Sequence, residues 1–217
     1  MAIEEIVHEI KENGIYKFQT PFLKKIDVED LRFLVKPLLE EAEDDYLFGK
    51  AARIGPYQSW RPTPIFDLFS QPLFQGIAQG FYEKAPSFNE IFVTHEFRND
   101  LGTERNGFLH FDRIPTLKFF FYLTDCNKDN GAFHYVPGSY KLGQQLRTAS
   151  NAETDVYGKI KNRLEIDFPD LGYTKKNAVP IEGDAGTLFI FHSDLFHYGG
   201  AIEEGREREI MRLHVRP

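Results

Sequence analysis

Apolar residues recur at helical spacing near the start of the chain and give way to short, strand-like runs later. Ile3, Ile6 and Ile10 fall on one face of a predicted helix, which Gly14 is expected to end. Residues 15–18 then predict a short strand. The chain therefore begins with a helix that has one apolar face and turns directly into an extended segment.

A second helix is predicted to begin with Asp27 as its N-cap and to run to about Glu43. Its apolar stripe consists of Leu31, Leu34, Val35, Leu38 and Leu39. Pro37 lies inside this stripe and is expected to kink or split the helix, because proline lacks the N–H group that a helix needs.

The next segments alternate between loop-like and helical patterns. Residues 51–64, which include Trp60, predict a loop or a short strand. Residues 67–82 predict a further helical region that Pro72 interrupts. Helices therefore dominate the first part of the chain.

From about residue 87 onward the pattern changes to short strands rich in aromatic residues. Strands are predicted at 91–97, 117–123, 132–136, 187–191 and 210–215. The run 117–123 is almost continuously apolar, which is typical of a strand buried on both faces. The 21 Phe and 10 Tyr are concentrated in these segments and favour a β-rich core.

These elements predict a mainly β fold of the α+β class: a jelly roll with helices packed outside it. We expect a single domain over residues 1–217, with a mixed helical support region at 1–88 and a jelly-roll core at 89–217. In such a roll, strands that are far apart in the sequence become neighbours in space.

The net charge and the cysteine content limit the classes of function that suit this protein. A net charge of −7 argues against binding to nucleic acid or to an anionic membrane surface. No apolar run reaches membrane-spanning length, and the acidic residues before Asn13 do not suit a targeting peptide. Cys126 is the only cysteine, which excludes an internal disulfide and any multi-cysteine zinc site. We expect a cytoplasmic protein.

The candidate chemistry lies at His110 and Asp112. On an extended strand, residues two apart point to the same side, so the imidazole and the carboxylate would project together. His197, much later in the chain, is a possible third ligand. Two histidines and one carboxylate with open positions form the facial triad of non-haem Fe(II) oxygenases. The metal ligands, and thus the catalytic residues, are predicted to be His110, Asp112 and His197.

Several motifs occur in an order that resembles the phytanoyl-CoA dioxygenase family of Fe(II)/2-oxoglutarate-dependent oxygenases. The motifs lie at 109–112, 119–125, 129–133, 136–140, 182–188 and 196–200. The resemblance implies a double-stranded β-helix, in which Fe(II) is held by His110, Asp112 and His197. It also implies O2 and 2-oxoglutarate as cosubstrates, succinate and CO2 as co-products, and hydroxylation of a small-molecule substrate.

The resemblance further implies an arginine, shortly after the second histidine, that pairs with the far carboxylate of 2-oxoglutarate. Arg208 fits the family's spacing best, with Arg206 and Arg212 as competitors. Arginine suits this role because its planar guanidinium forms two parallel hydrogen bonds to a carboxylate. Lys118 is a second candidate for the cosubstrate, provided that its face of the strand lines the barrel; an outward position is the alternative.

Another His-x-Asp pair occurs at His192 and Asp194, only three residues before His197, and we interpret it as structural. With Ser193 it could form a hydrolase-like set, but the strained glycine turn that exposes a serine nucleophile is missing. The long segment 141–179 is a candidate lid or binding loop.

Two other classes remain open from the sequence. One is a cupin-like metal enzyme that does not use 2-oxoglutarate, in which Arg208 would be dispensable. The other is a jelly-roll binding protein without catalysis, which would bind metal without turnover.

Overall fold

The computed structural model describes residues 2–42, 44–45, 49–54, 63–97, 107–112, 114–152 and 172–217. The helices are α1 (Ile3–Asn13), α2 (Lys25–Glu41), α3 (Thr63–Phe69), α4 (Pro72–Tyr82), α5 (Tyr140–Ala152) and the short 3-10 helix η2 (Lys175–Asn177). The strands are β1 (Ile15–Lys17), β2 (Asp44–Asp45), β3 (Gly49–Ile54), β4 (Ser87–Phe97), β5 (Leu117–Tyr122), β6 (Phe133–Tyr135), β7 (Val179–Ile181), β8 (Leu188–His192), β9 (His197–Gly199) and β10 (Glu207–Arg216).

The first helix and strand follow the predicted pattern. α1 buries Ile6 and Ile10, and Gly14 ends it in the left-handed conformation at φ 78°. The N–H of Gly14 donates to the carbonyl of Ile10 at 2.8 Å, which closes the last turn. β1 then begins at Ile15, so the predicted helix end and the predicted strand are both confirmed.

Two predictions about α2 are wrong, the N-cap and a split at Pro37, while the alternative of a kink at Pro37 stays a prediction. The N-cap is Lys24, and Asp27 is the third helical residue, whose carboxylate accepts a hydrogen bond from the N–H of Lys24 at 3.2 Å. Pro37 does not split the helix, which runs unbroken from Lys25 to Glu41. The buried residues of this helix lie on both sides of Pro37, at Leu31 and Leu39, so core packing outweighs the loss of one backbone hydrogen bond.

The predicted helical region 67–82 is two helices, α3 and α4, and Pro72 stands at the first position of α4, where its missing N–H costs nothing. Gly76 and Gly80 do not break α4. A side-chain Cβ at Gly76 would lie 2.7 Å from Ile3, and one at Gly80 would lie 3.0 Å from Val7. Glycine therefore lets α4 pack closely on α1.

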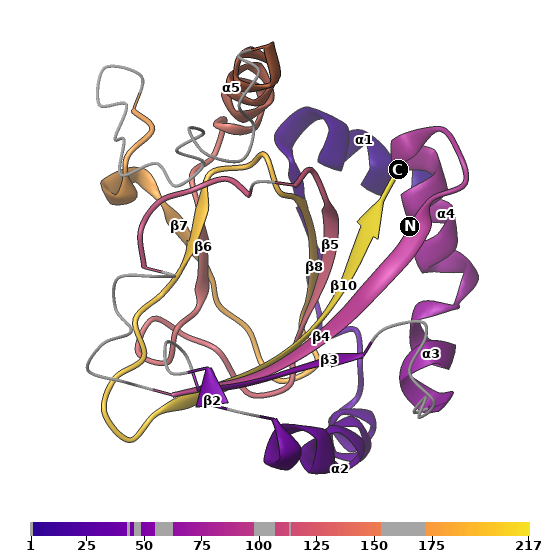
Figure 1. Ribbon diagram of the computed structural model, residues 1–217, viewed down its shortest axis with the longest axis vertical. Coiled ribbons are helices and arrows are strands. Elements are labelled where there is room, and N and C mark those ends of the chain that lie inside the picture. The colour runs from indigo at the N-terminus through magenta and orange to yellow at the C-terminus, as the bar shows by residue number, and fades with distance from the viewer. Residues whose placement is uncertain are drawn as a thin grey trace.

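The strands form two antiparallel sheets, a larger one and a smaller one that face each other (Figure 1). The larger sheet has the order β1-β8-β5-β10-β4-β3-β2, and the smaller one has the order β7-β6-β9. Neighbours in the larger sheet come from distant parts of the chain, since β10 pairs with β5 on one side and with β4 on the other. The jelly roll is confirmed, with its long strand crossovers.

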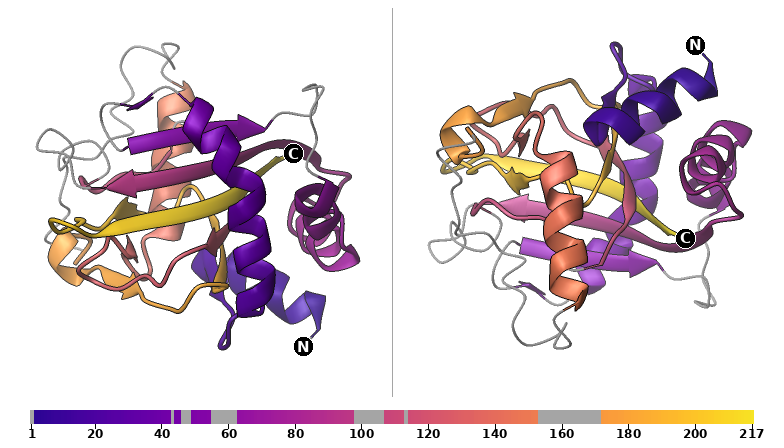
Figure 2. Two further views of the ribbon diagram at one scale, coloured as in Figure 1. Left: turned by 90° about the horizontal axis from the view of Figure 1, so that it is seen from below. Right: turned by 90° about the horizontal axis from the view of Figure 1, so that it is seen from above.

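Side-chain alternation divides the larger sheet into an outer face and an inner face. On β5, Phe119 and Phe121 point outward into a cluster with residues of α1, α2, α3 and α4, and these helices cover that face (Figure 2). Phe120 and Tyr122 point inward and pack against Phe133 of the smaller sheet. The inner face therefore carries the side chains that approach the candidate metal ligands.

The division of the single domain at residue 88 stays a prediction, although β1, β2 and β3 from the first part join the larger sheet. Trp60 and residues 153–171 of the predicted loop segment lie outside the described residues.

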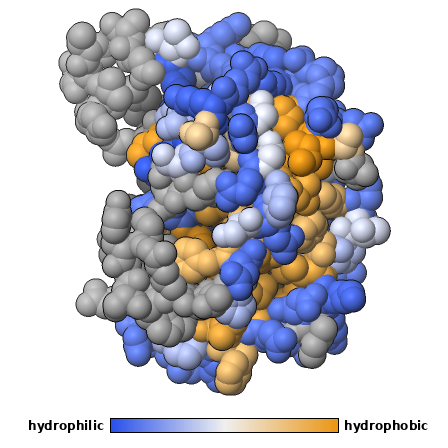
Figure 3. Space-filling model, turned by 90° about the vertical axis from the view of Figure 1, so that its right-hand side faces the viewer, coloured by the Kyte–Doolittle hydropathy of each residue, from blue (hydrophilic) through white to orange (hydrophobic). Residues whose placement is uncertain are grey.

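On the side that carries α3 and α4, apolar surface lies between polar side chains (Figure 3). Within the described ranges, no helix combines the length and apolar character needed to cross a membrane.

Candidate metal centre

The three predicted ligands come together at the open end of the roll. His110 and His197 form an antiparallel bridge, in which the N–H of His197 donates to the carbonyl of His110 at 2.8 Å and the reverse bond is 3.0 Å long. Asp112 Oδ1 lies 3.8 Å from Nε2 of each histidine. Within the described residues 107–112, only the bridge at His110 is strand-like, so Asp112 lies in an irregular segment and not on the regular strand that was predicted.

Both histidines present the same ring nitrogen to the centre. His110 Nδ1 lies 2.9 Å from the carbonyl of Phe108, and His197 Nδ1 lies 2.6 Å from the carbonyl of Leu195. These contacts place the ring proton on Nδ1, which makes the unprotonated Nε2 the ligand atom. Burial, together with the charge of His110, lowers the pKa of His197 to about 3, so its imidazole is neutral at neutral pH.

The carboxylate of Asp112 is held from its second oxygen by Lys118 of β5. Lys118 is 9% exposed, and its Nζ lies 2.5 Å from Asp112 Oδ2. Burial opposes ionisation of Asp112, but Lys118, His197 and His110 outweigh it and hold the pKa of the carboxyl well below its usual range. Lys118 therefore points into the roll, which decides between the inward and outward positions that the sequence left open. Its anionic partner is Asp112, the predicted metal ligand.

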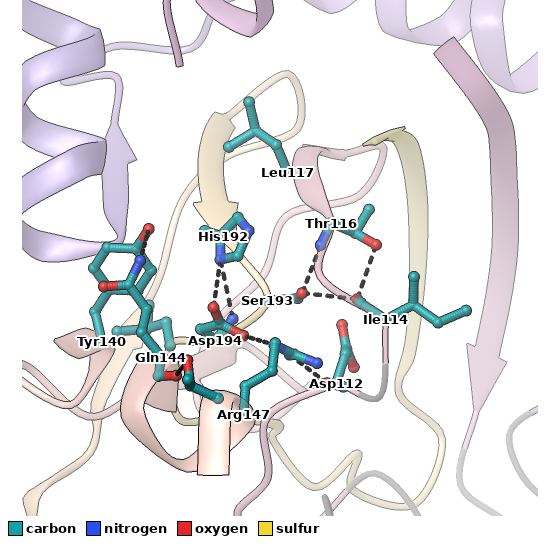
Figure 4. Close-up of polar contacts among 12 residues, drawn as sticks. Asp112, Ile114, Thr116, Leu117, Tyr140, Gln144, Arg147, His192, Ser193 and Asp194 are labelled. Atoms are coloured by element: carbon teal, nitrogen blue, oxygen red, sulfur yellow. Dashed lines mark hydrogen bonds and ion pairs between the residues drawn. The ribbon is translucent and has the colours of Figure 1, made fainter. Parts of the chain in front are cut away.

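The backbone of Asp112 is clamped on both sides by residues outside the ligand set (Figure 4). Its N–H donates to the carbonyl of Ser193 at 2.9 Å. Arg147, which reaches in from α5, donates from Nη2 to the carbonyl of Asp112 at 2.5 Å. The guanidinium of Arg147 also lies 5.3 Å from the centre of the Phe111 ring. α5 is thus tied directly to the peptide that carries a candidate ligand.

Arg147 is itself paired with Asp194, and its Nε donates to Asp194 Oδ1 (Figure 4). Asp194 Oδ2 lies 3.3 Å from Nδ1 of His192. Burial disfavours the charged form of Asp194, but His192 and Arg147 lower its pKa overall. This network confirms the structural interpretation of the His192–Asp194 pair.

The alternative in which Ser193 acts as the nucleophile of a hydrolase does not fit the structure. Ser193 is fully buried, and its Oγ accepts from the N–H of Thr116 at 2.8 Å and donates to the carbonyl of Ile114 at 3.0 Å. A hydroxyl engaged in this way is not available as a nucleophile.

Arg208 lies on the inner face of β10, 4% exposed, and is paired with Glu96 of β4. Thr94 Oγ1 donates to the other oxygen of Glu96 at 2.9 Å. The charge of Glu96 outweighs burial and raises the pKa of Arg208. Among the residues that the structure describes, the Nε of Arg208 has no hydrogen-bond partner, so the guanidinium keeps donor capacity beyond Glu96.

The two competing arginines lie in different surroundings. Arg206 is exposed just before β10, so it lies on the surface and not on the inner face of the roll. Arg212 shares the inner face of β10 with Arg208 and lies opposite Phe120 of β5. The sequence motifs brought the arginines to notice but did not reveal Glu96. The sequence feature that could have identified Glu96 is the polar pair Thr94 and Glu96, two residues apart in a strand that is otherwise rich in apolar residues.

The ligand set fits Fe(II). Two neutral imidazoles and one ionised carboxylate, with ligand atoms all within 4.8 Å of one another, can occupy one face of an octahedral ion. The opposite face would stay open for a bidentate cosubstrate and O2. This arrangement is the ligand geometry of non-haem iron oxygenases rather than of a closed structural metal site.

Comparison with known proteins agrees with this class. The family model described as "Phytanoyl-CoA dioxygenase (PhyH)" matches residues 86–210. Phytanoyl-CoA dioxygenase 1 of Oryza sativa subsp. japonica is 31% identical over 154 residues, which cover 70% of this chain and 49% of the relative. Phytanoyl-CoA dioxygenase of Arabidopsis thaliana is 29% identical over 99% of this chain and 83% of its own length. The chain spans about half the length of the rice relative.

Solved structures share the fold at low sequence identity. The epimerase SnoN in complex with Fe3+, alpha ketoglutarate and nogalamycin RO has a TM-score of 0.70 at 15% identity, over 99% of this chain and 83% of SnoN. HygX from Streptomyces hygroscopicus with nickel and 2-oxoglutarate bound has a TM-score of 0.67 at 14% identity, over 98% of this chain and 86% of HygX. The fold and the ligand set are those of the iron- and 2-oxoglutarate-dependent oxygenases. Within that class, this chain belongs to the phytanoyl-CoA dioxygenase family.

Proposed function

We propose that this chain is an Fe(II)/2-oxoglutarate-dependent dioxygenase that hydroxylates a small-molecule substrate, with succinate and CO2 as co-products. The observation that carries the proposal is the convergence of His110, Asp112 and His197, with their ligand atoms within 4.8 Å of one another, in a chain of this family. These three residues would hold the iron and are the catalytic residues of the proposed site. Iron supplies the activation of O2 that a side chain cannot provide.

The protein's own residues orient the ligands and keep them in the right protonation state. The carbonyls of Phe108 and Leu195 fix the two imidazoles with Nε2 toward the metal. Lys118 neutralises Asp112 Oδ2 and leaves Oδ1 facing the histidines. This ion pair supports a role for Lys118 in holding the ligand rather than in binding the cosubstrate. A carboxylate ligand at Asp112 leaves no room for a halide there, which favours hydroxylation.

Arg208 would bind the far carboxylate of 2-oxoglutarate, as the family spacing implies. Its burial on the inner face supports this assignment, because a desolvated guanidinium binds a carboxylate more strongly than an exposed one. The Nη1 of Arg208 approaches Gly131, where an added Cβ would lie only 3.2 Å away. Glu96 would keep the guanidinium in place while its remaining donors face the cosubstrate.

The segment 141–179 would contribute to substrate binding, which its attachment to the site through Arg147 of α5 supports. A cytoplasmic location is proposed on the single, buried Cys126, which forms no disulfide.

Turnover tests the proposal. Purified protein with Fe(II), ascorbate and 2-oxoglutarate should release succinate, faster when the correct member of a panel of small metabolites is added. His110→Ala should abolish this release, whereas the matched control His95→Ala, on β4 and paired with Glu207, should keep it. Metal binding without succinate in any combination would contradict the enzyme proposal and favour a binding protein.

A further inference from the structure

A second guanidinium on the inner face of the roll has no acidic partner. Arg212 forms no ion pair with any residue that the structure describes, and its buried Nε lacks a hydrogen-bond partner. The two other inner-face arginines of β10 are paired, Arg208 with Glu96 and Arg216 with Glu90 at 3.6 Å. Arg212 is half-buried, and a cation that is partly withdrawn from water without an ion-pair partner is stabilised by an anionic ligand.

The guanidinium of Arg212 is held in place by two aromatic rings. Its central carbon lies 5.4 Å from the centre of the Phe92 ring and 5.6 Å from that of the Phe120 ring. Aromatic contacts on a planar guanidinium fix its orientation and leave its N–H edges free to donate. Arg212 is therefore preorganised as a fork-shaped donor.

The surroundings of Arg212 are cationic or neutral on the side toward the metal ligands. Its strand neighbour two residues on, His214, lies opposite Lys118 of β5, and its ring centre lies 4.6 Å from that of Phe92 in a tilted arrangement. Burial and the charge of Lys118 keep the pKa of His214 well below its ordinary value, so His214 is neutral. The acidic groups that act on Arg212 are Glu96, which is already paired with Arg208, and Asp112, whose second oxygen is already paired with Lys118.

Charge counting over the inner faces of β4, β5 and β10, together with Asp112, leaves one positive charge without a partner. Lys118, Arg208, Arg212 and Arg216 are cationic, while Asp112, Glu96 and Glu90 are anionic. Fe(II) would add two positive charges, and the doubly negative 2-oxoglutarate would cancel those two. The loaded site would therefore retain a single positive charge at Arg212, which a monoanionic carboxylate would neutralise.

We propose that Arg212 binds a carboxylate of the substrate beside the metal, so that this enzyme oxidises a small carboxylic acid. The proposal rests on the proposed function, because the charge count includes iron and 2-oxoglutarate. The planar fork matches a carboxylate with two parallel hydrogen bonds. The single uncompensated charge favours a carboxylate over a dianionic phosphate ester.

Matched acid and amide probes test the proposal. Protein loaded anaerobically with Fe(II) and 2-oxoglutarate is titrated with butanoate and butanamide, hexanoate and hexanamide, and 3-phenylpropanoate and its amide. Binding is followed by the change in the visible charge-transfer band, so no turnover is needed. The variants are Arg212→Gln and Arg212→Lys, and the matched control is Arg216→Gln, which lies on the same face of the same strand.

In the wild type and in Arg216→Gln, at least one acid should bind roughly 30-fold or more tightly than its amide, the loss typical of breaking a desolvated charge pair. Arg212→Gln should abolish this difference and leave the affinity for 2-oxoglutarate within about threefold of the wild type. Arg212→Lys keeps the charge but not the planar fork, and should weaken acid binding in part.

Three results would overturn the proposal. One is a wild type that binds no acid more tightly than its amide. Another is an acid preference that survives in Arg212→Gln. The third is a loss of 2-oxoglutarate affinity of about 30-fold or more in Arg212→Gln, which would assign Arg212 to the cosubstrate. Failure of the proposed function would be seen separately, as a wild type that gives no charge-transfer band with Fe(II) and 2-oxoglutarate.

Discussion

Lys118 Nζ lies 2.5 Å from Asp112 Oδ2, on the side of the carboxylate away from the two imidazoles. The lysine comes from β5, in which every residue is buried, and the aspartate from the segment that leads into it. One oxygen of Asp112 is therefore committed to the protein, and the other is aimed at the metal. The same contact gives a buried lysine the counter-charge that it needs.

Replacing Lys118 should weaken iron binding although no ligand is removed. In Lys118→Met the carboxylate of Asp112 loses its fixed orientation, and the affinity for Fe(II) should fall by about 10- to 100-fold, as is typical when a group that orients a metal ligand is lost. Anaerobic titration with Fe(II) measures this change. Lys128→Met, at an exposed turn, is the control. An unchanged affinity in Lys118→Met would show that the ion pair does not position the ligand.

Arg147 should support both the fold and the metal centre. Arg147→Met leaves Asp194 buried without its guanidinium partner, and should lower the free energy of unfolding by about 3–5 kcal/mol. It also removes the donor to the Asp112 carbonyl, so the affinity for Fe(II) should fall in the folded variant.

Chemical denaturation and Fe(II) titration of the same preparations separate the two effects of Arg147. The control is Lys141→Met on the same helix, whose ion pair with Glu12 is half exposed and should contribute little. Loss of stability with full iron affinity would mean that Arg147 supports only the fold.

Arg208 should determine the affinity for 2-oxoglutarate and not that for iron. Removing one side of a partly desolvated charge pair costs about 2–5 kcal/mol, which corresponds to roughly 30- to 4,000-fold weaker binding. The charge-transfer band of the Fe(II) complex measures this in Arg208→Gln, with exposed Arg206→Gln as control. Wild-type affinity for 2-oxoglutarate in Arg208→Gln would contradict this assignment and would move the far carboxylate of 2-oxoglutarate to another cation, such as Arg212.

The pairing of Arg208 with Glu96 makes a separate prediction for stability. Arg208→Met should destabilise the protein by about 3–5 kcal/mol, because Glu96 is left charged and buried. The double variant Arg208→Met with Glu96→Gln should lose less than the sum of the two single variants, as expected for residues in direct contact. Additive losses in thermal or chemical unfolding would show that the two side chains are not coupled in solution.

The convergence of the three candidate ligands could be predicted from residue spacing and from the expected fold. His110 and Asp112 are two residues apart, and a jelly roll brings His197 beside them, as the observed bridge shows. The family motifs then limited the arginine expected to bind 2-oxoglutarate to three candidates on or just before β10: Arg206, Arg208 and Arg212. Strand alternation left only the inward or outward sense of Lys118 open.

The supporting contacts could not be predicted, because they depend on register and on helix placement. Arg208 meets Glu96 only because β10 pairs with β4 in one particular register, with Arg208 directly opposite Glu96. Arg147 reaches Asp194 and Asp112 from α5, whose position over the ligand segment is a matter of tertiary packing. The wrong expectation at Pro37 has the same origin, since burial on both sides of the proline overrides its local preference.

Anaerobic titration with Fe(II), followed by addition of 2-oxoglutarate, is the most direct test of whether His110, Asp112 and His197 bind iron. We expect one tightly bound Fe(II) per chain and a visible charge-transfer band when 2-oxoglutarate is added. His110→Ala and His197→Ala should each lose both signals, while His95→Ala, away from the centre on β4, should keep them. Undiminished Fe(II) binding in both His110→Ala and His197→Ala would contradict the assignment of the metal centre.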